Sequence, residues 1–177
     1  PELAEEAVQD LTDVFRATLG DAHSQFSLET ELDVARRYLH IEKLRLGERL
    51  TVEWDIGDLP LDAQLPALTL QPLLENAIYH GIEPLPEGGT IHIEGRRESG
   101  EVRLIINNPL PPAAQRTRTR GNRMALDNIR ERMAFAYGGG GVLKIDENGA
   151  QFRVELSFPA APPPDAPEGG HEDTDRR

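Results

Sequence analysis

Apolar side chains recur every three or four residues in four stretches of the chain, the spacing of an amphipathic helix. These stretches cover residues 3–19, 28–46, 70–80 and 124–137. Ser27 is expected to cap the second helix at its start and Gly47 to end it, and Gly81 is expected to cap the third. The fourth helix should turn its apolar side inward. That side consists of Met124, Leu126, Ile129, Met133 and Ala136.

Strict alternation of apolar and polar residues predicts a second class of element, half-buried strands. The alternating stretches are residues 50–55, 90–96, 101–107, 142–146 and 152–158. Glu98-Ser99-Gly100 and Asn148-Gly149 are typical hairpin turns, whereas the segment 58–66 contains prolines and is expected to be a loop. The order of elements predicts an α+β fold: a two-layer α/β sandwich with a mixed sheet, helices on one face, and a helical segment before it.

The chain divides into three parts by composition. Residues 1–25 form a short helix with an apolar seam that needs a partner, and residues 26–159 form the sandwich. Residues 160–177 are rich in Pro, Gly and acidic residues, so we expect a disordered tail. The start at Pro1, within a helical pattern, suggests a piece of a longer protein.

Charge and cysteine content narrow the possible functions. Lys and Arg number 19 and Asp and Glu 31, a formal charge of −12, which makes nucleic acid a poor partner for the whole chain. There is no Cys, which excludes disulfides and thiolate metal sites. One stretch is basic instead, with six arginines and two acids between residues 116 and 132. A local anionic ligand is the favoured interpretation, and a short nucleic-acid-binding arm is the alternative.

The strongest candidate chemistry lies on the helix LQPLLENAIYHGI, residues 70–82. Its apolar side chains face a core, while Gln71, Glu75 and Tyr79 share a second face and Asn76 and His80 a third. A carboxylate, an amide oxygen and an imidazole at this spacing suit a hydrated divalent cation and a polyphosphate. A solvated helix face is the alternative interpretation.

Three stretches in order resemble one family. QPLLENAIYHGI is similar to the N box of LytS-type sensor histidine kinases, close to their AlgZ/FimS branch. YLHIEKLRLGERL, residues 38–50, and GNRMALDNIRERM, residues 121–133, agree with it. The resemblance covers residues 3–159 and implies the Bergerat-type ATP-binding fold of the histidine kinase, gyrase and Hsp90 superfamily.

The resemblance implies roles for the residues of the third helix. Asn76 would be the Mg²⁺ ligand that bridges the phosphates of ATP. Glu75 would be the catalytic acid that helps to polarise the attacking group. His80 would approach the phosphates, and Tyr79 would also contact the nucleotide.

Both glycine boxes of the family are altered here. The family reads adenine with an Asp in a D-x-G-x-G motif, where this chain has Asn107-Asn108-Pro109-Leu110-Pro111, so Asn107 is expected to replace the Asp. Asn108 is also expected to bind the nucleotide. An ordinary Asn-Pro turn is the alternative. The second box corresponds to six nucleotide-contacting positions. They are Gly121, Asn122, Arg123, Met124, Ala125 and Leu126.

The implied function is the ATP-binding catalytic portion of a two-component sensor histidine kinase, with ATP and Mg²⁺ as cofactors. The γ-phosphoryl group would pass to a His on an upstream helix, outside this chain, and then to a response regulator with a receiver domain. Residues 1–25 would be the second helix of a dimerisation hairpin, in a cytoplasmic domain of an inner-membrane protein. Two alternatives remain: a degenerate kinase acting as a regulatory scaffold, favoured by the altered glycine boxes, and a non-kinase ATPase of the superfamily.

Overall fold

The computed structural model describes residues 24–112 and 120–161, with the side chains of 120–123 excepted. Our predictions for the first helix, the disordered tail and most of the Arg-rich loop therefore lie outside the described residues. Among the described residues, no helix is long and apolar enough to span a bilayer.

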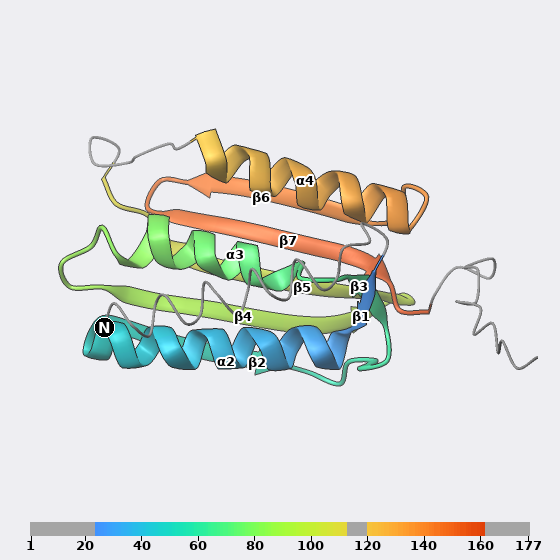
Figure 1. Ribbon diagram of the computed structural model, residues 1–177, viewed down its shortest axis with the longest axis horizontal. Coiled ribbons are helices and arrows are strands. Elements are labelled where there is room, and N and C mark those ends of the chain that lie inside the picture. The colour runs from blue at the N-terminus through green and yellow to red at the C-terminus, as the bar shows by residue number, and fades with distance from the viewer. Residues whose placement is uncertain (1–23, 113–119, 162–177) are drawn as a thin grey trace, which may run out of the picture.

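A five-stranded sheet forms one layer of the molecule, in the order β2-β4-β5-β7-β6 (Figure 1). β2 pairs with β4 in parallel and the other neighbours are antiparallel, so the sheet is mixed as predicted. Two hairpins fall at the predicted turns, where Ser99, Gly100 and Gly149 have positive φ. The strands are β2 (Leu50–Ile56), β4 (Gly89–Glu98), β5 (Glu101–Pro109), β6 (Val142–Asn148) and β7 (Gln151–Pro159).

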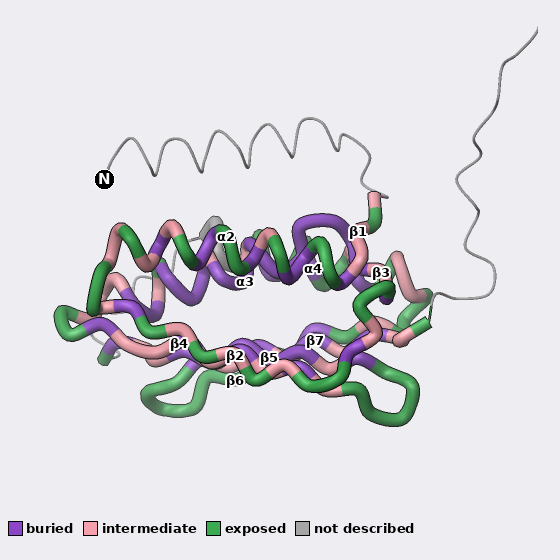
Figure 2. Tube along the Cα trace, turned by 90° about the horizontal axis from the view of Figure 1, so that it is seen from below, coloured by how far each residue is buried: buried purple, intermediate pink, exposed green. Residues whose placement is uncertain are grey.

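In the part of the chain that the structure describes, three α-helices form the second layer, all on one face of the sheet (Figure 2). They are α2 (Leu28–Leu46), α3 (Leu70–Ala77) and α4 (Arg120–Ala136). α2 has the predicted ends: the Ser27 side chain accepts from the Thr30 N–H, and Gly47 ends the helix with φ of 59°. These features confirm the predicted α+β sandwich.

The core lies between the two layers. Apolar stripes of the helices meet the inward residues of the strands, and burying each such side chain contributes about 1.5–3 kcal/mol. The largest fully buried side chains include Leu28, Leu50, Leu73, Leu74, Ile78, Ile82, Ile91, Ile129, Met133, Leu156 and Phe158.

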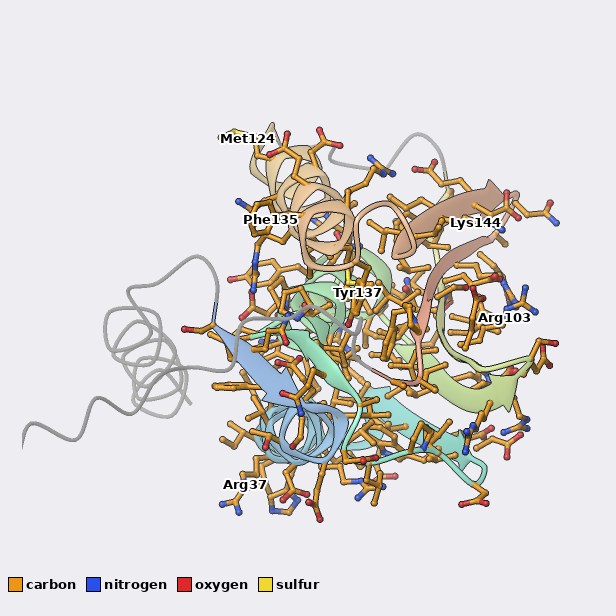
Figure 3. All side chains as sticks on the ribbon, turned by 90° about the vertical axis from the view of Figure 1, so that its right-hand side faces the viewer. Arg37, Arg103, Met124, Phe135, Tyr137 and Lys144 are labelled. Carbon is orange, nitrogen blue, oxygen red and sulfur yellow. The ribbon has the colours of Figure 1, made fainter. Side chains whose placement is uncertain are left out.

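Four details differ from the sequence prediction. The segment 58–66 holds a short strand, β3 (Gln64–Pro66), which pairs with β1 (Gln25–Ser27). Gly81 does not cap α3, because the helix continues as a π-helical turn, η2 (Ile78–Ile82). α4 begins at Arg120, four residues before the predicted start. Met124 does not face inward. It is 65% exposed and lies on α4 away from the sheet (Figure 3).

Candidate functional site

Asn76 occupies the last turn of α3 and is 9% exposed. Its Oδ1 is shielded from solvent and has no hydrogen-bond partner among the described residues. A buried acceptor left in this state costs about 1–3 kcal/mol. Folding alone does not explain this amide, and an orphaned amide oxygen fits a hard cation such as Mg²⁺.

Gly81 brings the π-turn η2 into close contact with the end of β5. A Cβ on Gly81 would lie 2.2 Å from Nδ2 of Asn108 and 2.8 Å from the carbonyl oxygen of Pro109. No other residue fits there without a shift, and π-turns of this kind are frequent at functional sites. The glycine is therefore needed for contact between two elements, and not for ending a helix.

Asn108 is the buried residue of the asparagine pair near the end of β5, at 3% exposure. Its Nδ2 donates to the Pro109 carbonyl at 2.8 Å, which fixes the amide. Its Oδ1 is left buried and without a partner among the described residues. A second orphaned amide oxygen therefore lies beside Gly81.

Asn107 points to the opposite face of the sheet. In the strand register it aligns with His92 on β4 and Arg153 on β7, whereas Asn108 aligns with the buried Phe152. The Asn107 Nδ2 donates to Gln151 Oε1 at 2.8 Å. Its Oδ1 also lacks a partner within the described ranges. It lies, however, on the face that the helices leave uncovered, so the structure argues against our assignment of Asn107 as the adenine-reading residue.

Glu75 is directed toward α2. It accepts a hydrogen bond from Gln71 Nε2 at 3.0 Å. Burial raises the pKa of Tyr38 on α2 strongly, and the nearby Glu42 and Glu75 carboxylates raise it further. The predicted catalytic acid thus belongs to a charged cluster between α2 and α3.

His80 lies in the π-turn and is partly buried, next to the exposed Tyr79. Burial lowers the pKa of His80, and the charge of Glu83 opposes this effect. At neutral pH the ring is therefore uncharged and offers one N–H donor and one acceptor. It can donate to a phosphate oxygen, or become cationic when phosphate charge arrives.

The second glycine box forms the start of α4. Gly121, Asn122 and Arg123 lie in its first turn, where backbone N–H groups have no partner within the helix. Ala125 is exposed like Met124, whereas Leu126 is 8% exposed and belongs to the core. The six predicted nucleotide positions therefore do not behave alike. The Leu126 side chain packs in the core and is not available to a nucleotide.

The basic stretch is less available than its sequence indicates. Arg130 pairs with Asp127 at 2.9 Å, and Arg132 donates to the Ala67 carbonyl. Both described arginine side chains have protein partners, so they weaken the case for a basic patch that binds an anion.

Two polar networks escaped the sequence prediction. Glu31 is buried and accepts backbone N–H groups of Leu68, Thr69 and Leu70 at 2.6–3.0 Å. Arg45 pairs with both Glu42 and Glu83. The only available signal was the presence of charged residues at core-facing helical positions, such as Glu31 beside Leu32.

Comparison with known proteins agrees with this architecture. The family model for histidine kinases matches residues 1–50. Sensor histidine kinase BtsS of Escherichia coli K12 is 37% identical over 160 residues, which are 89% of this chain and 28% of BtsS. Sensor protein LytS of Oceanobacillus iheyensis is 27% identical over 171 residues, 89% of this chain and 29% of LytS. The catalytic domain of histidine kinase ThkA superposes with a TM-score of 0.56 at 18% identity, covering 79% of this chain and 98% of that domain.

The fold is that of histidine kinase catalytic domains, and the sequence is similar to sensor histidine kinases, LytS among them. The chain spans less than a third of the length of these curated relatives. The similarity to sensor histidine kinases and the match to histidine kinase catalytic domains support the ATP-binding portion of a two-component kinase.

Proposed function

We propose that this chain binds Mg-ATP between α3, η2 and the end of β5. Its larger protein would transfer the γ-phosphoryl group to a histidine on an upstream helix. A response regulator would then receive the group on an aspartate. The observation that carries the proposal is the pair of amide oxygens without partners among the described residues, on Asn76 of α3 and on Asn108, whose amide group lies against Gly81.

Each residue has a distinct part in this proposal. Asn76 Oδ1 would ligate Mg²⁺, which when bound neutralises charge on the phosphates. Asn108 Oδ1 would accept from the adenine amino group in place of the expected Asn107. His80 would meet phosphate oxygens, and Glu75 would act near the attacking group. Phosphoryl transfer needs mainly such positioning and charge.

We also propose an oligomeric state and a location for the larger protein. Residues 1–25 would contribute to a homodimer, and the domain would lie in the cytoplasm as part of an inner-membrane protein. The three motifs favour the AlgZ/FimS-like branch.

Asn76→Ala is the first test. It should abolish Mg²⁺-dependent ATP binding while keeping or slightly raising stability, because an unpartnered buried acceptor is removed. Calorimetric titration with and without Mg²⁺, together with thermal unfolding, measures both effects. Unchanged Mg²⁺-dependent affinity in the folded variant would contradict the magnesium role, and no nucleotide binding by the wild type would favour a regulatory scaffold.

Asn108→Ala and Asn107→Ala form a matched pair for the adenine site. Loss of one neutral hydrogen bond at Asn108 should weaken ATP binding about 2- to 10-fold, while Asn107→Ala should leave it unchanged. Asn107→Asp should likewise bring no gain, because that side chain faces away from the helices. If only the Asn107 variants alter the affinity for ATP, Asn107 and not Asn108 is the residue that binds adenine.

A further inference from the structure

An ion-pair cluster joins the last turn of α2 to the segment after the π-turn. Arg45 Nη2 lies 2.5 Å from Glu42 Oε2 and 2.5 Å from Glu83 Oε1. The side chains of Arg45, Glu42 and Glu83 are 18%, 7% and 24% exposed, so solvent screens these pairs less than surface pairs. One guanidinium therefore holds two carboxylates from different parts of the chain.

Arg49 fixes the same segment through its backbone. Its Nη2 donates to the carbonyls of Glu83 and Leu85, both at 2.9 Å. Gly88 has φ of 74°, and a Cβ there would lie 1.8 Å from the Arg49 carbonyl oxygen. The segment from Glu83 to Gly88 thus has a defined position against the end of α2.

Glu83 stands three residues after His80, a spacing at which helical side chains are neighbours. Its carboxylate is the charge that acts on the His80 ring. Glu42, Arg45 and Glu75 are the other charged groups near Glu83 and Tyr38 in this cluster. Arg45 therefore holds the carboxylate whose charge opposes the effect of burial on the pKa of His80.

We propose that Arg45 is a positioning residue for His80: by holding Glu83 in an ion pair, it prevents Glu83 from pairing with His80 and leaves the imidazole available to the nucleotide. The nucleotide part rests on the function proposed above. The effect of Arg45 on the charge of Glu83 near His80 does not depend on that function. This assigns a role to the motif YLHIEKLRLGERL, which supplies Glu42, Arg45 and Arg49.

The test compares Arg45→Met, Glu83→Gln and the double variant with wild type. Arg96→Met is the matched control, because it breaks an Arg–Asp pair on the outer face, far from α3. The readouts are the His80 titration midpoint by NMR without nucleotide, assigned through His80→Gln, and the Mg-ATP affinity by calorimetry. Thermal unfolding reports whether each variant is folded.

Arg45→Met should raise the His80 midpoint and weaken Mg-ATP binding several-fold, and adding Glu83→Gln should reverse both changes. Glu83→Gln alone should lower the midpoint and keep the affinity, which tests the effect of the Glu83 charge on His80 even if Arg45→Met is unstable. An unchanged His80 midpoint in both single variants would overturn the proposal, as would an affinity loss that Glu83→Gln does not reverse. Absence of nucleotide binding in the wild type would refute the proposed function alone, because the titration is measured without nucleotide.

Discussion

Three buried amide oxygens lack partners among the described residues, and those of Asn76 and Asn108 lie on the helical side of the sheet, where folding does not explain them. A satisfied core would pair Asn76 and Asn108 or replace them by apolar residues, since each orphan costs about 1–3 kcal/mol. Such local costs are expected where a site is prepared for a ligand. At the residue scale, the proposed site is therefore marked by buried amide oxygens without hydrogen-bond partners among the described residues, one of them on Asn108, beside Gly81.

His80 should make ATP binding dependent on pH. Burial keeps the pKa of His80 below its ordinary value of about 6.5 in the free protein, and phosphate charge would raise it on binding. Nucleotide binding should then take up a proton, so affinity should rise as pH falls from 8 to 6. Calorimetry in buffers of different ionisation enthalpy measures this uptake, and His80→Gln should remove it. Proton uptake that persists in that variant would show that another group is responsible.

At the scale of elements, Glu31 connects α2 to the start of α3. Its carboxylate accepts three backbone N–H groups that precede or begin α3, and Arg132 of α4 donates to the adjacent Ala67 carbonyl. One buried carboxyl group therefore fixes the helix that carries Asn76. The arrangement resembles a helix cap, supplied by a residue far away in sequence.

Glu31→Gln should destabilise the fold by about 1–3 kcal/mol, because its amide nitrogen replaces one of the two oxygens that accept these N–H groups. Glu29→Gln, one exposed position in the same turn, is the control. Burial raises the pKa of Glu31 in spite of its N–H donors. The folded state then binds this proton more tightly than the unfolded state, so the contribution of Glu31 is greatest at low pH and declines as pH rises through the folded pKa. Denaturant unfolding of the three proteins at several pH values is the measurement. The difference in unfolding free energy between wild type and Glu31→Gln should decrease as the pH rises.

Local signals explain what could be predicted from the sequence. The Ser27 cap, the end at Gly47 and the hairpin at Asn148-Gly149 depend on neighbouring residues, and all three are confirmed. The alternation of β5 extends to position 108, so the inward direction of Asn108 was available from the pattern. The fold could thus be predicted almost entirely.

Contacts between distant segments explain what could not be predicted. β1 and β3 have three residues each, too few to show alternation, and they exist through their mutual pairing. The role of Gly81 depends on Asn108, and the burial of Glu31 on the N–H groups of α3. Such tertiary contacts leave no periodic signal in the chain.

The whole molecule has two unlike faces. Helices cover one face of the sheet (Figure 2). Polar side chains pair on the other face, including Arg103 with Glu155 at 3.0 Å and His92 with Glu53 at 3.0 Å. These pairs are partly exposed and should add little stability. The proposed chemistry is accordingly confined to the helical side.

This chain alone, incubated with Mg-ATP, should not accumulate phosphohistidine. Among the described histidines, His40 is exposed on α2, His92 pairs with Glu53 on the outer face, and His80 is assigned to the nucleotide site. The measurement is acid-labile incorporation of the γ-phosphate, and a longer protein that includes the proposed upstream helix and acceptor histidine is the positive control. A stable acid-labile label on this chain would instead direct attention to His23, His40 and His92.

The π-turn also constrains how this protein can evolve. The Glu83 N–H bonds to the Ile78 carbonyl at 2.9 Å, five residues back, so the turn contains one residue more than an α-helix needs. Deleting one residue would restore a regular helix but rotate everything after it by about 100°. Gly81 would lose its contact with Asn108, and Glu83 would lose its ion pair with Arg45. Related chains should therefore vary freely in length at the hairpin of Ser99 and Gly100, yet keep a fixed length between Asn76 and Gly88.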